Sequence, residues 1–142
     1  MKINRTRPFV ISGLAILLTI STATFMGCSS GDEGPDQTPA FIGTFTVNEI
    51  DPVTKDVEET YDIFISKVSS TEIDIDNFRF FVVPIRATVS GNNLTINSQS
   101  FTQGKVTIAI TGSGQLDIDE LTYSYTLTGY LNTTKFCVAT RK

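Results

Sequence analysis

The stretch Leu121-Thr122-Tyr123-Ser124-Tyr125-Thr126-Leu127 alternates large apolar or aromatic residues with small hydroxyl residues. Successive side chains of a β-strand point to opposite faces, so this spacing puts the leucines and tyrosines on one face and the hydroxyls on the other. The stretch therefore predicts a strand with one buried face and one face in water.

The same period of two recurs along most of the chain. Residues typical of turns, such as Asp51-Pro52 and Ser90-Gly91-Asn92-Asn93, separate the repeats by short connections, which favour antiparallel neighbours. We expect an all-β fold, an antiparallel meander of about eight strands, and we prefer a closed barrel to a β-sandwich because closure removes exposed edges. The other segments with this spacing are Phe41–Val47, Tyr61–Ile65, Ile73–Ile75, Phe81–Val89, Leu94–Ile96, Val106–Ile110 and Phe136–Val138.

The N-terminus has the order of a secretory signal peptide. Residues 1–7 carry cations and no anion, an apolar run follows from Phe9 to Ile20, and small and apolar residues lead to Gly27-Cys28. This leader resembles that of bacterial lipoproteins, in which the cysteine is acylated on sulfur and becomes the first residue of the mature chain. The resemblance implies cleavage between Gly27 and Cys28, a lipid on Cys28 and attachment to a membrane.

Two other interpretations of the leader stay open. Ser21-Thr22-Ala23 is a small-x-small site for the general signal peptidase, which would release an ordinary secreted protein. The run from Phe9 to Met26 is barely long enough to span a bilayer and is diluted by hydroxyl residues, so a transmembrane anchor ranks third.

The remaining chain divides into a tether and one domain. Residues 28–40 form an acidic segment with no aliphatic or aromatic residue between Ser29 and Pro39, which predicts a flexible tether. Residues 41–142 suffice for a single all-β domain with one modest core. Ser29-Ser30 followed by Asp32 and Glu33 resembles the acidic signal that sends some Gram-negative lipoproteins to the surface of the outer membrane. We expect surface display in preference to periplasmic retention, with a merely solvated linker as the alternative.

Composition excludes several classes of function. The net charge is −4, and loss of the leader removes three cations, so the mature chain lacks the basic patch that nucleic acid requires. The chain has no histidine, which removes Ser–His and Cys–His nucleophile pairs and histidine-bearing zinc sites. We expect no enzyme activity, no catalytic residue, no metal site and no cofactor.

Four further features have structural rather than chemical interpretations. Asp74-Ile75-Asp76 and Asp117-Ile118-Asp119-Glu120 are interpreted as solubilising charge opposite inward Ile75 and Ile118, in preference to calcium ligands. Gly112-Ser113-Gly114 predicts a bulge or tight bend, because no helix follows to make a phosphate cradle. Cys137 has no partner if Cys28 carries lipid, and we expect a small buried hydrophobe in the last strand.

Residues 41–142 as a pattern resemble the small lipocalin-like lipoproteins. Gly43-Thr44-Phe45 takes the place of the lipocalin Gly-x-Trp signature, with phenylalanine for tryptophan. Lipocalins set a basic residue after the last strand against that tryptophan, and the resemblance implies that Arg141 meets Phe45. An eight-stranded barrel has room for at most one small ligand.

The run from Phe78 to Ile85 is apolar on both faces, so something must cover the second face. Phe64, Phe78, Phe80 and Val82 form a candidate binding patch, with plain packing as the alternative.

Two functions follow from these features. The first is a non-catalytic binding module that holds a small apolar ligand in the barrel mouth or presents a patch to a protein or glycan partner. The second is a structural or accessory lipoprotein whose barrel is filled by aromatic side chains. An enclosed cavity of about 300 Å³ or more favours the first, and a solid core favours the second.

Overall fold

The computed structural model describes residues 34–79, 81–129 and 132–142 of the chain. The leader, Gly27 and Cys28 lie outside these residues, so cleavage and lipidation stay predictions. In the part of the chain that is described, no helix is long and apolar enough to cross a membrane.

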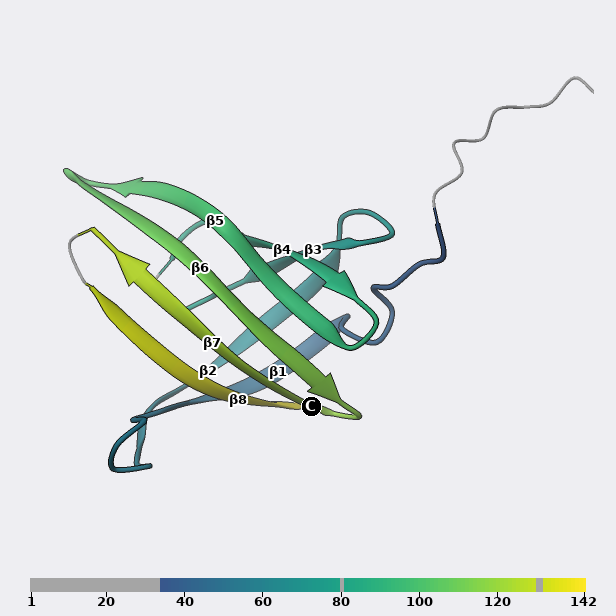
Figure 1. The fold of residues 1–142 in the computed structure, drawn as a ribbon, viewed down its shortest axis with the longest axis horizontal. Coiled ribbons are helices and arrows are strands. Elements are labelled where there is room, and N and C mark those ends of the chain that lie inside the picture. Colours follow the sequence, from purple (N-terminus) through teal and green to yellow (C-terminus); the bar gives the residue numbers. More distant parts are fainter. Residues whose placement is uncertain (1–33, 80, 130–131) are drawn as a thin grey trace, which may run out of the picture. The chain divides into compact units, whose positions relative to one another are not determined.

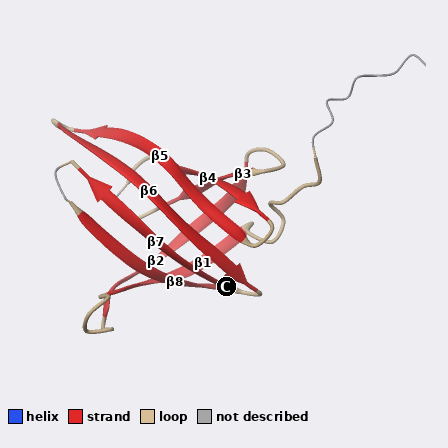
Figure 2. Ribbon diagram, in the orientation of Figure 1, coloured by secondary structure: helices blue, strands red, loops and turns tan. Residues whose placement is uncertain are grey.

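Eight antiparallel strands close into one barrel, as predicted (Figure 1). Each strand pairs with the next, and the last pairs with the first from Phe45↔Arg141 to Ile50↔Phe136, so the barrel has no open edge. Figure 2 shows strands joined by loops, and a loop segment that leads into the first strand, with no helix in the described region. The strands are β1 (Gly43–Ile50), β2 (Val57–Lys67), β3 (Glu72–Asp76), β4 (Ile85–Ser90), β5 (Asn93–Gln103), β6 (Val106–Asp117), β7 (Glu120–Thr128) and β8 (Thr133–Arg141).

The alternation that predicted the strands also sorts their side chains. Leu121, Tyr123, Tyr125 and Leu127 of β7 are all buried inside the barrel, and the hydroxyl residues between them lie on the outer wall. Apolar side chains from all eight strands meet in a single core, so the domain has one hydrophobic interior.

The predicted strand over Phe81–Val89 is wrong in its first part, because β4 begins only at Ile85. The described residues between β3 and β4, 77–79 and 81–84, form a loop, called here the 77–84 loop, in which Asn77 and Arg79 have positive φ angles of 58° and 54°. Such angles are incompatible with a strand. Proline also lacks the N–H that a strand interior needs, and Pro84 ends this loop immediately before β4.

Two other expectations need correction. Ile118 is 84% exposed at the β6–β7 turn, with a φ of 55°, so it does not face inward, whereas Ile75 does. The bulge is absent at Gly112-Ser113-Gly114, which pairs with β7 in unbroken register. It lies opposite, on β5, where the register with β6 shifts between Ile96 and Gln99.

The glycines of β6 instead make room inside the barrel. A Cβ atom built on Gly114 would lie 2.4 Å from Cβ of Tyr123, and one built on Gly112 would lie 3.1 Å from Cβ of Tyr125. Any larger residue would collide with the tyrosines of β7, so this pair of glycines allows two large rings to enter the core.

The barrel has two distinct ends. The β1–β2, β3–β4, β5–β6 and β7–β8 connections lie at one, called here the loop end. The other, the terminal end, holds the remaining turns together with the start of β1 and the end of β8.

Arg141 closes the terminal end. Its guanidinium lies 4.6 Å from the centroid of the Phe45 ring, and its Nη1 donates a hydrogen bond to the carbonyl of Ile42 at 2.6 Å. Its Nη2 donates to the carbonyl of Ala40. The expected contact between Arg141 and Phe45 is confirmed.

The last residues of the segment expected to be a tether pack on this end. The backbone N–H of Gln37 donates to the carbonyl of Ser70 at 2.7 Å, and the N–H of Gly91 donates to Oε1 of Gln37 at 2.9 Å. Thr38 is fully buried. The end of this segment is therefore part of the folded domain, and it reaches the barrel at the terminal end.

Candidate functional site

The loop of residues 77–84 puts aromatic rings into the barrel from the loop end. Phe78 is fully buried, with its ring centroid 5.0 Å from that of Tyr125, 5.9 Å from Tyr123 and 6.3 Å from Phe81. These rings occupy the volume that an internal ligand would need.

Three of the four residues of the predicted binding patch, Phe64, Phe78 and Val82, are described. Phe78 faces the interior, so it takes no part in a surface patch. Phe64 is 50% exposed on the outer wall of β2, and Val82 is 87% exposed in the 77–84 loop. Phe80 lies outside the described residues.

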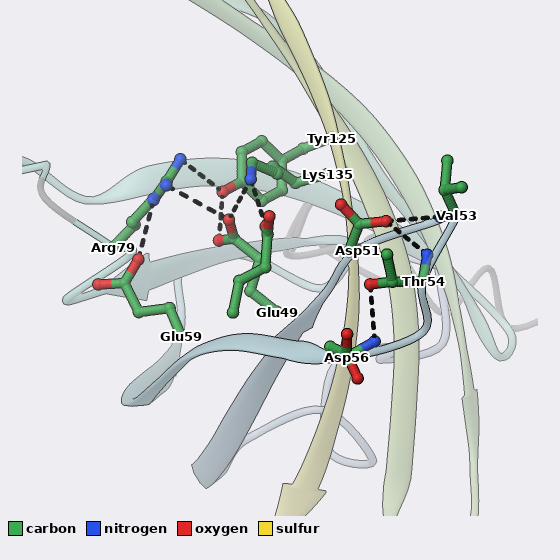
Figure 3. Close-up of polar contacts among 10 residues, drawn as sticks. Glu49, Asp51, Val53, Thr54, Asp56, Glu59, Arg79, Tyr125 and Lys135 are labelled. Atoms are coloured by element: carbon green, nitrogen blue, oxygen red, sulfur yellow. Dashed lines mark hydrogen bonds and ion pairs between the residues drawn. The ribbon is translucent and has the colours of Figure 1, made fainter.

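A buried carboxylate holds this loop in place (Figure 3). Glu49 ends the inward row of β1, and its side chain has no solvent exposure. Its Oε1 lies 3.3 Å from Nη2 of Arg79 and 3.2 Å from Nζ of Lys135, as ion pairs. Its Oε2 accepts a hydrogen bond from the hydroxyl of Tyr125 at 2.9 Å. The loop is therefore tied through Arg79 to two strands across the barrel.

Each cation has a second acidic partner nearer to solvent. Nε of Arg79 lies 3.3 Å from Oε2 of Glu59, and Nζ of Lys135 lies 2.5 Å from Oε2 of Glu58. The hydrogen bond to Glu58 is the main cause that raises the pKa of Lys135. Burial lowers the pKa of Arg79, but neighbouring Tyr125, Glu49 and Glu59 outweigh it, and the net shift is upward. Both side chains thus stay positively charged, which matches the buried carboxylate.

Three more polar side chains, those of Tyr61, Tyr123 and Cys137, lie near the Glu49 carboxylate. Burial raises the pKa values of Tyr61 and Tyr123, and it raises the pKa of the Cys137 thiol to about 12. The thiol is therefore protonated at neutral pH and is a poor nucleophile. Cys137 is fully buried in β8, as the sequence predicted.

Sequence reasoning missed Glu49 and Lys135, although a signal for both was present. Phe45 and Val47 are inward residues of β1, and extending their alternation by one step reaches Glu49. Lys135 likewise lies two positions before the inward-facing Cys137 on β8, so the same alternation directs its side chain inward. Arg79 carried no such signal, because it lies in a loop whose path depends on where Phe78 packs.

A small apolar pocket lies on the loop, at the loop end. It has a volume of about 280 Å³ and lies between the 77–84 loop and the last residues of β5. The Phe81 and Phe101 rings, with centroids 5.5 Å apart, lie beside the exposed Val82 and Val83. This volume lies just below the lower end of the usual range for ligand pockets, about 300–1,000 Å³, so the pocket has room for no more than one small apolar group.

One aspartate of each acidic motif considered for calcium forms an ion pair with an arginine. Oδ1 of Asp74 lies 2.6 Å from Nε of Arg86, and Oδ1 of Asp119 lies 3.1 Å from Nε of Arg141. Among the described residues, no group of three or more acidic, cysteine or histidine side chains is placed to hold a metal ion.

No protein-family model matches the chain, and no curated protein or solved structure shows significant similarity to it.

Proposed function

We propose that this protein is a membrane-anchored, non-catalytic lipoprotein that binds one small apolar ligand at the loop end of its barrel. The pocket formed by Phe81, Val82, Val83 and Phe101 carries the proposal, because it is the described hollow at the barrel mouth and most of its lining is apolar. Val82, 87% exposed, gives up the most water when a ligand covers it.

The pocket lies at the loop end of the barrel, opposite the end where the chain enters, and this arrangement supports an N-terminal anchor. The chain enters the barrel at the terminal end, where Gln37 bonds to Ser70 and Gly91. A lipid on Cys28 would anchor the domain through the segment that enters at this end, which leaves the loop end and its pocket free of the attachment point.

The buried charges support a non-catalytic role. Glu49 is fully buried, and its carboxylate lies against two cations and a hydroxyl, so it is closed off from a substrate. Cys137 is a protonated, buried thiol. Through its ion pair with Arg79, Glu49 holds the loop that carries the pocket.

Native mass spectrometry of the full chain, extracted directly from its membrane, tests both parts of the proposal. Anchoring predicts a mature chain that begins at Cys28 and carries acyl mass, which Cys28→Ser loses. A product that starts at another residue would overturn the anchor.

Ligand binding is read in the same spectra after addition of 1-naphthol, a small neutral aromatic probe. We expect a one-to-one adduct that Val82→Asp weakens at least tenfold. Val53→Asp is the matched control, because Val53 is 85% exposed in the β1–β2 loop at the same end of the barrel. No adduct, or equal weakening by the two variants, would exclude the pocket.

The filled interior favours a second function, an accessory lipoprotein with no small-molecule ligand. Phe41, Phe45, Phe78 and Tyr125 are all fully buried, so the barrel core is occupied by the protein's own rings. Failure of the probe experiment with the acylated chain intact would support this function.

A further inference from the structure

A second hollow lies on the outer wall of the barrel, across β5, β6, β7 and β8. Its volume is about 390 Å³, larger than the pocket at the loop end. Most of its lining residues lie on the outer face, and the inward-facing Leu94, Gly114 and Tyr123 complete it from below.

The strand register arranges the floor of this hollow into a row. Residues paired across neighbouring strands lie side by side on the same face, about 4.8 Å apart from strand to strand. Four lining residues follow one another in this way, with Ser113 paired to both Thr95 and Ser124, and Ser124 paired to Phe136. Four strands give three spacings, so the row is about 14 Å long. Three short hydroxyl side chains thus form a trough that ends at an aromatic ring.

A second row forms one border of the trough. Gln115 pairs with Asn93 on β5 and with Thr122 on β7. The hydroxyl of Thr122 donates a hydrogen bond to the backbone carbonyl of Gln115 at 3.4 Å, and this bond uses neither the Gln115 nor the Asn93 side-chain amide. Each amide offers a carbonyl acceptor and two N–H donors, and each hydroxyl both donates and accepts.

The lining carries no charge. None of the described residues that line the trough is acidic or basic, although the chain has 15 acidic and 11 basic residues. A charged ligand would therefore lose water without gaining an ion pair there, which disfavours anions and cations. The ligand that fits is neutral and rich in hydroxyl groups.

Phe136 adds an apolar face to this polar surface. Its side chain is 42% exposed on the outer wall of β8, an unusual place for a phenylalanine beside serines. Sugar rings combine hydroxyls at their edges with an apolar C–H face, so they match a hydroxyl floor that ends at an aromatic ring. The length of the trough exceeds a single sugar ring and suits an extended chain.

We infer that the outer wall of β5–β8 is a binding site for a neutral oligosaccharide. Phe136 stacks on the C–H face of one sugar, while Ser113, Ser124 and Gln115 exchange hydrogen bonds with the hydroxyls of its neighbours. The site is separate from the pocket at the loop end, so either can exist without the other.

Affinity electrophoresis of the full chain, purified in mild detergent, tests this site. Native gels are cast with soluble neutral polysaccharides, namely a β-glucan, a galactomannan, glycogen and hydroxyethyl cellulose, and with polygalacturonate as an anionic control. We expect retardation by at least one neutral polymer and none by polygalacturonate. Phe136→Ala should weaken the binding at least tenfold.

Phe64→Ala is the matched control, because Phe64 is 50% exposed on the outer wall of β2 and does not line the trough. It should stay within twofold of the parent. If Phe136→Ala proves misfolded by circular dichroism, Ser113→Gln decides instead, because it fills the floor without adding charge and should weaken binding equally. Absence of retardation by every neutral polymer, retardation by the anion alone, or equal losses in the two phenylalanine variants would overturn the inference.

Discussion

Replacing Glu49 by glutamine tests whether the buried carboxylate holds the barrel and its loop together. The change keeps the size of the side chain and removes only its charge. Arg79 and Lys135 then lose a buried counter-charge at 3.3 Å and 3.2 Å, and the hydrogen bond from Tyr125 becomes one to a neutral amide. Hydrogen bonds to charged groups contribute more than neutral ones, so both effects destabilise the folded state.

The loss of stability in Glu49→Gln depends on which acidic partners Arg79 and Lys135 still have. Removing one partner of a fully buried ion pair costs about 3–5 kcal/mol, because the other charge is left buried and unpaired. Here the side chains of Arg79 and Lys135 are 18% and 17% exposed, and they keep Glu59 and Glu58 as partners. We therefore expect a smaller loss, about 2–3 kcal/mol in the free energy of unfolding. For a domain of this size, the melting temperature should fall by about 10–20 °C.

Urea unfolding followed by far-ultraviolet circular dichroism measures this loss. Glu59→Gln is the control, because Glu59 meets the same Arg79 but its side chain is 49% exposed. An exposed ion pair contributes only about 0–1 kcal/mol, so this variant should stay near the parent. A Glu49→Gln variant within about 0.5 kcal/mol of the parent, the range of ordinary surface substitutions, would refute the reasoning. So would equal losses in the two variants.

Three further predictions concern pH, packing and the ordered N-terminal segment. Folding raises the pKa of the Cys137 thiol from 9.0 to about 12, so its contribution to stability is complete below pH 9 and is lost as pH rises toward 12. Cys137→Ala should flatten the fall in the urea midpoint that begins near pH 9, and an unchanged profile would contradict this assignment. Gly114→Ala should cost about 1–3 kcal/mol in thermal unfolding because the new Cβ collides with β7, whereas Gly34→Ala, with nothing within 4 Å, should cost nothing measurable. Asp36 has a pKa of about 2 rather than 3.8, chiefly because a lysine hydrogen bonds to it, so its contribution is present above pH 3.8 and disappears as pH falls toward 2. Asp36→Ala should therefore speed amide hydrogen exchange at Thr38 at neutral pH, and exchange that stays slow would show that other contacts hold the segment.

Much of the fold was predictable because a half-buried strand imposes a period of two on its sequence. Tyr123 and Tyr125 alternate with hydroxyl residues, and both lie inside the barrel. The contact of Arg141 with Phe45 was predictable from the lipocalin resemblance and is present at 4.6 Å.

The candidate site was less predictable because its parts come together only through the closed barrel. In sequence, Phe78 and Val82 belong to one apolar run. In the structure the first is fully buried and the second is 87% exposed, because positive φ angles at Asn77 and Arg79 turn the chain between strands. An apolar run without a steady period does not indicate which residues point inward.

The amino-acid sequence alone determined the number of strands, their antiparallel order and the composition of the core. The physical reason is that alternation, turn residues and apolar content act locally, over a few residues. Only the tertiary structure decided that Glu49 meets Arg79 and Lys135, that the 77–84 loop fills the barrel, and that four strands align Thr95, Ser113, Ser124 and Phe136 in a row. These contacts join residues far apart in the chain, and they depend on strand register and barrel closure, which no single segment encodes.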